Sequence, residues 1–351
     1  MSIEPIRLTQ YSHGAGCGCK ISPQVLEEIL AGSLVIPDND KLLVGNHSKD
    51  DAAVYDLGNG SALISTTDFF MPIVDDPFDF GRIAAANAIS DVYAMGGKPI
   101  LSIAILGWPV KILPAGIAKK VIEGARSMCL EAGIPLAGGH SIDAPEPIFG
   151  LAVNGLIPIS NIKKNNAAEV GDLIFLTKKI GVGILTTAEK RGSLQEEHIG
   201  LAKKQMVELN KIGEELGKLA CITAMTDITG FGLGGHLVEL AEGSGKSAEI
   251  DWLKIPLITD LSYYISKRVF PDGTNRNWNS YGSKIGFENK DMDDNSFIVL
   301  ADPQTNGGLL ITVKESGMKE FKEVMNTFGL NNFLESIGRI TEKSEKAVII
   351  R

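Results

Sequence analysis

Apolar residues recur with two spacings along the first half of the chain, and these spacings predict alternating helices and strands. Helical spacing with many alanines covers residues 80–95, and amphipathic helices are expected over 22–33 and 114–132. Short apolar runs indicate strands at residues 62–67, 99–107, 134–138 and 148–157. Strands that alternate with helices in this way favour a mixed α/β domain.

A polar stretch over residues 158–170 marks the junction to a second unit, because domain boundaries fall in exposed polar segments. The second unit is expected to be irregular over 254–286, with helices at 197–218, 233–244 and 315–327 and strands at 171–177, 297–300, 309–313 and 346–350. The chain therefore divides into a flexible segment (1–20), an N-terminal α/β domain (21–158) and a C-terminal α+β domain (170–351).

Composition narrows the classes of protein that fit. The 351 residues are 44% hydrophobic and 22% charged, which is typical of a globular chain of about two domains. A net charge of -9 argues against a general nucleic-acid binder, although metal ions can still join carboxylates to phosphates. We expect no membrane span, since no run of about 18 apolar residues occurs, and no signal peptide at the start.

The four cysteines, Cys17, Cys19, Cys129 and Cys221, are few and unevenly spaced. This favours the reducing cytoplasm over a disulfide framework. Cys129 and Cys221 have apolar neighbours, and we expect both to be buried as small apolar side chains.

The segment Ser12–Lys20, called the cysteine loop below, combines two thiols and an ammonium group with three glycines. Glycine lets a backbone approach a ligand closely, and a nearby lysine favours the reactive thiolate. The loop is therefore predicted to be mobile and to carry a reactive cysteine. Cys-x-Cys could also be half of a zinc site, but no second cluster completes one, and a disordered terminus is the plainer alternative.

Aspartates at the ends of predicted elements give the second chemical signal: Asp50, Asp51, Asp68, Asp91 and Asp227. Several could simply be turn or N-cap residues. Asp91 is harder to explain in that way, because a carboxylate among apolar helical neighbours is costly unless it is paired or metal-bound. Carboxylates that converge on one place would bind Mg²⁺ together with substrate phosphates.

Two glycine-rich turns are predicted, at Gly138–Ser141 and at Gly230–Gly235. Both could offer backbone N–H groups to phosphate oxygens. Neither is a Walker A motif or a Rossmann fingerprint. Their histidines, His140 and His236, could serve a ligand, but we favour slightly the alternative that both are buried and hydrogen-bonded.

Seven segments taken in order closely resemble the selenophosphate synthetases, also called selenide, water dikinases. These segments are 14–20, 50–55, 66–70, 88–97, 138–142, 226–232 and 302–308. The aspartate and Gly-Gly motifs alone would indicate the wider superfamily of aminoimidazole ribonucleotide synthetases, thiamine monophosphate kinases and related ATP users. The Cys-Gly-Cys-Lys run narrows the resemblance to the selenium enzymes.

The resemblance implies that ATP, selenide and water give selenophosphate, AMP and phosphate, supplying activated selenium for selenocysteine and selenouridine. It implies Mg²⁺, with two or more ions expected, and a homodimer in which the N-terminal sheet pairs with that of a second subunit. It also allows a K⁺ requirement and a selenium-delivery protein, for which the residues themselves give no sign.

The resemblance also implies roles for individual residues. Cys17 is the reactive residue, Lys20 is essential and contacts ATP, and Asp51, Asp91 and Asp227 bind the metal. The further ATP contacts fall on Ser48, Lys49, Asp50, Asp68, Asp91, Gly139, His140 and Ser141. Asn306 is a small departure, because Ser is expected there.

Two other functions remain open at this stage. Another ATP-dependent kinase or ligase of the superfamily would not need the cysteine loop, so Cys17→Ala would leave its turnover intact. A carrier of metal or selenium would bind its cargo without consuming ATP, but such a protein has no use for a set of nucleotide-metal aspartates.

Overall fold

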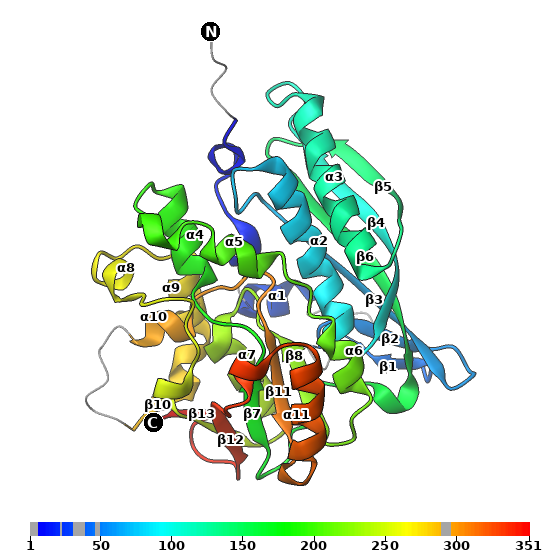
Figure 1. Ribbon diagram of the computed structural model, residues 1–351, viewed down its shortest axis with the longest axis vertical. Helices are drawn as coiled ribbons and strands as arrows, with labels where there is room; N and C mark the ends of the chain where they lie inside the picture. Colours follow the sequence, from blue (N-terminus) through cyan, green and yellow to red (C-terminus); the bar gives the residue numbers. More distant parts are fainter. Residues whose placement is uncertain (1–5, 22, 31–38, 46–49, 289–295) are drawn as a thin grey trace.

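The computed structural model describes residues 6–21, 23–30, 39–45, 50–288 and 296–351, which form two sheets with helices packed on them (Figure 1). Ser48 and Lys49, two of the expected ATP contacts, lie outside the described residues. No helix in these ranges is long and apolar enough to cross a membrane.

The N-terminal domain is built on a six-stranded sheet with the order β1-β2-β3-β6-β4-β5. Its strands are β1 (Leu42–Val44), β2 (Ala53–Asp56), β3 (Ser61–Phe70), β4 (Lys98–Trp108), β5 (Leu136–Asp143) and β6 (Ile148–Pro158). Neighbouring strands are antiparallel, except that β4 and β5 are parallel. Helices α2 (Pro77–Ala94) and α3 (Ala115–Ala132) pack together beside the sheet, and the short α1 (Pro23–Leu30) precedes it (Figure 1).

Helix α2 connects the two domains, contacting β3 and β6 on one side and β8, α5 and α6 on the other. It begins where Asp76 caps the backbone N–H of Asp79 and Pro77 fills the first turn. Its alanines allow close packing, and glycines let it touch α3: a Cβ on Gly81 would lie 1.9 Å from the carbonyl oxygen of Val121. Polar side chains on α2 are therefore held rigidly between the domains.

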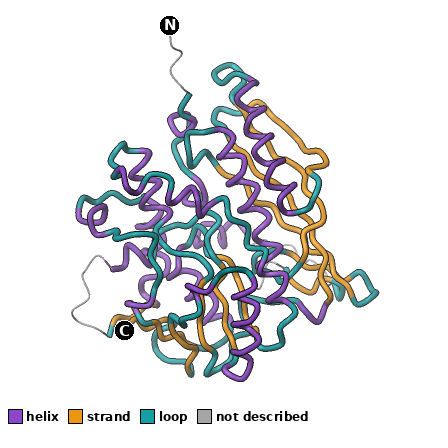
Figure 2. Tube along the Cα trace, viewed as in Figure 1, coloured by secondary structure: helices purple, strands orange, loops and turns teal. Residues whose placement is uncertain are grey.

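The C-terminal domain contains a seven-stranded sheet with the order β10-β13-β9-β12-β7-β11-β8. Figure 2 shows the strands of this domain in the lower part of the view and those of the N-terminal sheet on the right. The strands of the C-terminal domain are β7 (Leu173–Leu176), β8 (Ile222–Asp227), β9 (Ser247–Ile250), β10 (Ile285–Phe287), β11 (Leu309–Val313), β12 (Gly338–Thr341) and β13 (Val348–Ile350). Its helices are α4 (Val182–Lys190), α5 (Leu201–Met206), α6 (Ile212–Gly217), α7 (Gly232–Gly243), α8 (Ser262–Ser266), α9 (Asp272–Tyr281), α10 (Ser296–Leu300) and α11 (Met318–Thr327). Phe175 of β7 and Phe321 of α11 meet in the core that α6 and α11 share with the sheet.

The mixed α/β prediction is confirmed, and the long helices and most strands lie where their spacing placed them. The predicted strand at 297–300 is wrong, because Ser296–Leu300 forms α10 against α7 and α9; short apolar runs do not distinguish a strand from a buried helix. The region 254–286, expected to be irregular, contains α8 and α9.

The single helix predicted over 197–218 is also wrong. The segment is divided into a short 3-10 turn (Glu196–His198), α5 and α6. Asn210 lies in the break with its side chain fully enclosed, and its Nδ2 donates to the Ser90 hydroxyl at 2.8 Å and to the Gly307 carbonyl at 2.9 Å. The break therefore serves a contact between the domains that helical spacing does not reveal.

Candidate active site

The candidate active site lies where the cysteine loop meets α2 and the end of β8. Asp68 is near the end of β3, Asp91 is on α2, Asp227 ends β8 and Asp51 precedes β2. The four aspartates lie close enough for their charges to act on one another or on Lys20. The structure thus brings together residues that the sequence spreads over about half of its length.

Each of the four aspartates accepts a hydrogen bond from a neighbouring side chain. The donors are Thr226 to Asp51 (2.8 Å), Asn87 to Asp68 (2.5 Å), Thr66 to Asp91 (2.5 Å) and Ser90 to Asp227 (2.6 Å). Such bonds fix the direction in which each carboxylate points, and outer contacts of this kind commonly tune metal ligands.

The carboxylates of this site are crowded, and those of Asp91 and Asp227 are buried. Burial, and then the charge of Asp227, raise the pKa of both Asp51 and Asp91 well above the usual range for a carboxyl group. Burial also raises the pKa of Asp227 to about 6. Groups arranged in this way disfavour their own negative charge, so a cation would bind here with a strong electrostatic gain.

One oxygen of this cluster fits a metal directly: Oδ2 of Asp51 is buried without a hydrogen-bond partner among the described residues. In the same part of the chain, no group of three or more His, Cys, Asp or Glu side chains is arranged to hold an ion unaided. This combination suits Mg²⁺, which takes one or two carboxylates and completes its shell with water and substrate phosphates.

Cys17 is almost completely buried, with an exposed fraction of 2%. Its Sγ donates to Oδ1 of Asn87 at 3.2 Å, and its backbone N–H donates to the Thr305 hydroxyl at 3.1 Å. Burial and the charge of Asp68 raise the pKa of the thiol well above its ordinary value, and Lys20 offsets this only in part. The effect expected of Lys20, a lower pKa for the Cys17 thiol, is therefore outweighed by burial and Asp68 in this conformation.

Lys20 supplies a positive charge beside the four carboxylates. Loss of water around its ammonium group lowers the pKa, but the charges of Asp68, Cys17, Asp91 and Asp227 outweigh this and raise it above the ordinary value. Its Nζ also lies 5.7 Å from the centroid of the Phe231 ring, within the range of a cation–π contact. Lys20 is therefore protonated throughout the physiological pH range.

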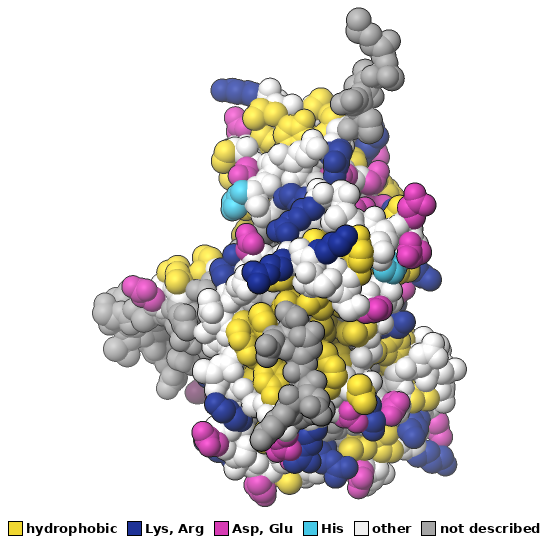
Figure 3. All heavy atoms as spheres, turned by 90° about the vertical axis from the view of Figure 1, so that its left-hand side faces the viewer, with side chains coloured by type: hydrophobic (Ala, Val, Ile, Leu, Met, Phe, Trp, Pro, Cys, Tyr) yellow, Lys and Arg dark blue, Asp and Glu magenta, His cyan; other side chains and the backbone are white. Residues whose placement is uncertain are grey.

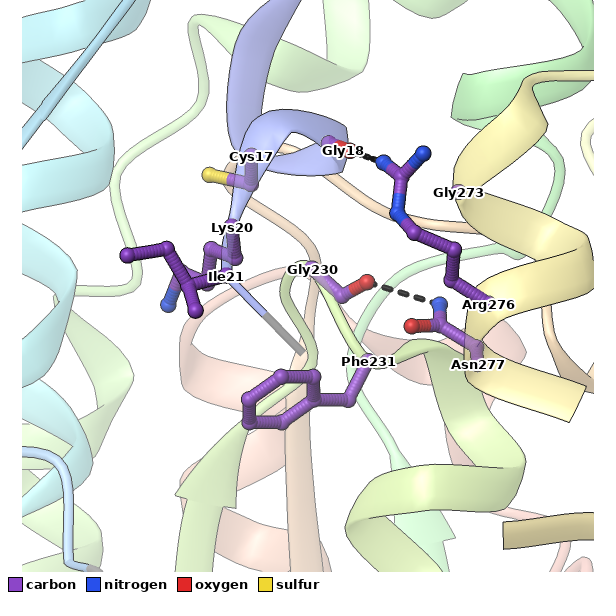
Figure 4. Close-up of a pocket in the computed structure, with 9 residues that line it drawn as sticks. All are labelled: Cys17, Gly18, Lys20, Ile21, Gly230, Phe231, Gly273, Arg276 and Asn277. Carbon is purple, nitrogen blue, oxygen red and sulfur yellow. Dashed lines mark hydrogen bonds between the residues drawn. The ribbon is translucent and has the colours of Figure 1, made fainter. Parts of the chain in front are cut away.

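The loop takes a compact form in which its two sides differ. Residues Gly16–Cys19 form a 3-10 turn, η2, and Figure 4 shows the Cys17 thiol and the Lys20 side chain on the side opposite to Arg276. Gly230 supports it, because a Cβ there would lie 2.5 Å from the Cys17 carbonyl oxygen. The turn predicted over Gly230–Gly235 is wrong beyond its first two residues, because α7 begins at Gly232. The predicted mobility of the loop is a separate property and stays a prediction.

The loop at residues 302–308 also borders the site. The conformation of Asn306 accounts for an Asn at the position where Ser is expected. Asn306 has a φ of +49°, and Asn adopts this left-handed conformation more readily than most residues. Its backbone N–H donates to Oδ1 of Asn87 at 2.7 Å, and its Nδ2 donates to the Met206 and Glu208 carbonyls. The Asn side chain therefore secures the loop.

The glycine-rich turn predicted at Gly138–Ser141 is wrong, because these residues lie within strand β5 at the edge of the N-terminal sheet. Gly139, His140 and Ser141 line a separate cavity of about 230 Å³ whose lining includes Arg126 and none of the four aspartates. Within one subunit, the structure does not bring these expected ATP contacts to the aspartate site. His140 is exposed, so its expected burial is also wrong.

His236 is buried as expected, and its Nε2 accepts the backbone N–H of Thr229 at 3.1 Å. Cys129 and Cys221 are buried free thiols, also as expected. Asp50 faces the domain junction, where its Oδ1 accepts the backbone N–H of Asn165 at 2.7 Å.

Burial of His236 predicts a loss of stability in acid. Burial lowers the pKa of His236 from 6.5 to about 3, so the folded state binds fewer protons than the unfolded state between these values. The free energy of unfolding should therefore fall as the pH drops from about 6.5 towards 3. Urea titrations of the protein and of His236→Gln should show a shallower fall in the variant; equal pH slopes would contradict the assignment.

Comparisons with known proteins decide the family. The model for the N-terminal domain of AIR synthase related proteins matches residues 49–157, and that for the C-terminal domain matches residues 169–351. The selenide, water dikinase of Colwellia psychrerythraea is 58% identical over 98% of each chain. That of Photobacterium profundum is 61% identical over 89% of each chain. The chain belongs to the selenide, water dikinase family.

More distant structures show the same fold. Thiamine-monophosphate kinase from Stenotrophomonas maltophilia has a TM-score of 0.63 at 18% identity, covering 89% of this chain and 92% of its own. The hydrogenase maturation protein HypE in complex with ATP has a TM-score of 0.59 at 18% identity, covering 89% and 87%. The fold of this chain is thus shared with the wider group of AIR synthase-like proteins, as the sequence resemblance implied.

Sequence motifs predicted the aspartates, Cys17 and Lys20, but they gave no role to Asn87 or Ser90. Both are polar side chains with no exposed surface on an otherwise alanine-rich helix. Asn87 and Ser90 are three positions apart, so they share one face of the helix. Two polar residues on one face of an alanine-rich helix are the signal that could have identified them.

Proposed function

We propose that this chain converts ATP, selenide and water into selenophosphate, AMP and orthophosphate. The observation that carries the proposal is the position of a buried thiol and an ammonium group, Cys17 and Lys20, against a cluster of four aspartates. The names of the relatives support the selenium chemistry. The ATP complex of the structural neighbour HypE supports a nucleotide in this fold.

In this proposal Asp51, Asp91 and Asp227 hold two or more Mg²⁺ ions between them, each ion taking one or two of the carboxylates, and Asp68 lies at the nucleotide phosphates. Magnesium bound by these carboxylates would neutralise charge on the phosphate oxygens. Lys20 adds a fixed cation near the transferring phosphoryl group. Cys17, the buried thiol of the cysteine loop, contacts the selenium species, and the loop excludes water from the first transfer.

Nucleotide analysis tests this reaction. Anaerobic mixtures of the protein, Mg²⁺ and ATP, with and without selenide, should be separated by ion-exchange chromatography. We expect AMP to accumulate in proportion to the selenide consumed, with only slow nucleotide turnover when selenide is absent. ADP as the final product would indicate a superfamily kinase, and selenide binding without any ATP consumption would indicate a carrier.

The active unit is proposed to be a homodimer that pairs through the N-terminal sheet. Phe69 of β3, Ile103 of β4 and Ile142 of β5 are 50%, 42% and 60% exposed. The strand register places all three on one face of that sheet. Such a row of exposed apolar side chains is typical of an interface. Pairing would also give a second subunit the opportunity to supply the edge-strand residues Gly139–Ser141 to the aspartate site.

Sedimentation equilibrium of the protein and of Ile103→Glu tests the dimer. We expect a dimer for the unchanged chain and a monomer with impaired turnover for the variant, because a buried unpaired charge opposes association. A matched variant in an exposed position outside the sheet, Leu253→Glu, should remain a dimer. A monomeric unchanged chain that turns over normally would contradict this part of the proposal.

Asn87→Ala tests a positioning role for this side chain. Asn87 holds the Cys17 thiol through Oδ1 and Asp68 through Nδ2, so its loss should lower turnover by about 10–100-fold, as for other outer contacts of a metal site. The pH profile of Cys17 alkylation should shift as well, which a general loss of stability would not cause. Asn326→Ala, on the exposed face of α11, is the control; an unshifted profile would contradict the role.

The other expectations stay predictions. The described thiols, Cys17, Cys129 and Cys221, are free, which supports a place in the reducing cytoplasm. A K⁺ requirement and a selenium-delivery partner rest on the family resemblance alone.

A further inference from the structure

Three buried polar side chains form a chain of hydrogen bonds that ends at Asp227. Asn210 donates through Nδ2 to Oγ of Ser90 at 2.8 Å, and the Ser90 hydroxyl donates to Oδ2 of Asp227 at 2.6 Å. The chain crosses the junction between the domains, because Ser90 lies on α2 and Asn210 lies between α5 and α6, which pack beside α2 (Figure 1). Asn210 is thus joined to an expected metal ligand through a single hydroxyl group.

The direction of each hydrogen bond in this chain follows from the groups involved. Nδ2 of Asn210 also donates to the Gly307 carbonyl oxygen at 2.9 Å, and a carbonyl oxygen can only accept. The amide nitrogen, and not the amide oxygen, must therefore lie on this side of the Asn210 side chain. A hydroxyl group has one hydrogen, so Ser90, which accepts from Asn210, directs its own hydrogen to Asp227.

The loop that contains Gly307 is itself held against the break between α5 and α6. Lys178, which is buried, donates through Nζ to the Glu208 carbonyl at 2.7 Å and to the Asn306 carbonyl at 3.0 Å. The Asn306 side chain donates to the same Glu208 carbonyl at 2.8 Å. Because these bonds tie the loop to the break, Asn210 is fixed at both ends of its side-chain contacts.

A turn residue is the plainer explanation for an Asn between two helices. Asn side chains in turns bond to backbone a few positions away, whereas the Nδ2 bonds of Asn210 reach Ser90 and Gly307, 120 and 97 positions away. Polar groups on the surface have water as a partner, as do the Lys and Arg side chains gathered across one face in Figure 3. Ser90 has no exposed surface, so its hydrogen-bond donor comes from the protein.

We infer that Asn210 is a positioning residue for the metal site. By directing the Ser90 hydrogen to Oδ2 of Asp227, Asn210 holds the carboxylate in one orientation and leaves its other oxygen for a cation. Neighbours that orient a metal-ligating carboxylate raise its affinity for the metal, and successive hydrogen bonds in a buried chain strengthen one another. The inference rests on the Mg²⁺ binding that is part of the proposed function.

A Mg²⁺ titration of Asn210→Leu tests this inference without selenide. The melting temperature is measured with a non-hydrolysable ATP analogue, and the Mg²⁺ concentration that gives half of the maximal gain is the Mg²⁺ midpoint. Leucine fills a similar volume but has no donor, so we expect the Mg²⁺ midpoint to rise about tenfold. The matched control is Gln205→Leu, since Gln205 is a buried amide whose bonds go to the Lys179 backbone. It should lower stability and leave the Mg²⁺ midpoint unchanged.

Ser90→Ala separates action through the hydroxyl from a general loss of stability. If Asn210 acts through Ser90, Asn210→Leu should raise the Mg²⁺ midpoint in the unchanged protein but not in Ser90→Ala. Asn210→Ala gives the same comparison if leucine prevents folding.

The inference is overturned if the Mg²⁺ midpoint of Asn210→Leu equals that of Gln205→Leu, or if the effect of Asn210→Leu is undiminished in Ser90→Ala. An unchanged protein without any Mg²⁺-dependent gain would contradict both this inference and the proposed metal site. An unchanged protein that shows the gain but makes no selenophosphate would contradict the proposed function alone.

Discussion

Lys20→Ala is expected to lower the rate of selenophosphate formation by at least about 10²–10³-fold, the usual cost of removing one preorganised electrostatic group. Lys20 is the cation that Asp68, Asp91 and Asp227 hold in its charged form. The charge of Lys20 lowers the pKa of Asp51, Asp227 and Cys17, and Lys178 also acts on Asp227. The loss of Lys20 should therefore weaken the countercharge of the acidic cluster. Initial rates of AMP formation measure the effect.

Lys20→Arg and Lys204→Ala are the controls for this prediction. Arginine keeps the charge but changes its shape and reach, so partial activity is expected. Lys204 is exposed on α5, and its replacement should leave the rate unchanged. A Lys20→Ala protein that retains activity within tenfold of the unchanged protein would contradict a direct electrostatic role for Lys20.

Asp51→Asn is expected to abolish ATP turnover and yet to raise the melting temperature of the metal-free protein. Burial and the charge of Asp227 raise the pKa of Asp51, so the ionised carboxylate destabilises the folded state when no cation is bound. The amide removes this repulsion but cannot replace the carboxylate as a ligand. The rate should fall by at least about 10²-fold. Differential scanning calorimetry and rate assays on the same samples check both effects.

Added Mg²⁺ provides a further test of whether Asp51 is a metal ligand. Because a ligand that binds only the folded state raises its stability, Mg²⁺ with a non-hydrolysable ATP analogue should raise the melting temperature of the unchanged protein more than that of Asp51→Asn. Asp56→Asn, an exchange in the same strand region outside the cluster, should behave like the unchanged protein. A variant that loses activity but keeps the full Mg²⁺-dependent gain would place Asp51 outside the metal site.

Local sequence carried enough information to predict the main chemical groups. The cysteine loop, Asp91 on α2 and Asp227 at the end of β8 lie in short motifs whose residue types already indicate their chemistry. The helical spacing predicted α2, which positions Asp91, whereas the strand β8, which positions Asp227, was not predicted. The mixed α/β class followed from the same alternation.

Contacts between distant segments could not be predicted in this way. Asn87 meets Cys17 across 70 positions of sequence, and Thr226 meets Asp51 across 175. The raised pKa of the Cys17 thiol depends on burial that only the folded chain creates. Residues Gly138–Ser141 were predicted to form a turn because of their two glycines, whereas β5 continues through them beside β4.

Phosphorus NMR of an anaerobic mixture of the protein, Mg²⁺, ATP and selenide tests the central claim most directly, beside the same mixture with Cys17→Ser. The account predicts a phosphorus resonance coupled to selenium, together with AMP and orthophosphate, and its loss in the variant. ADP without any phosphorus–selenium species in the unchanged protein would contradict the proposed reaction. Full selenophosphate formation by Cys17→Ser would contradict the role given to the cysteine loop.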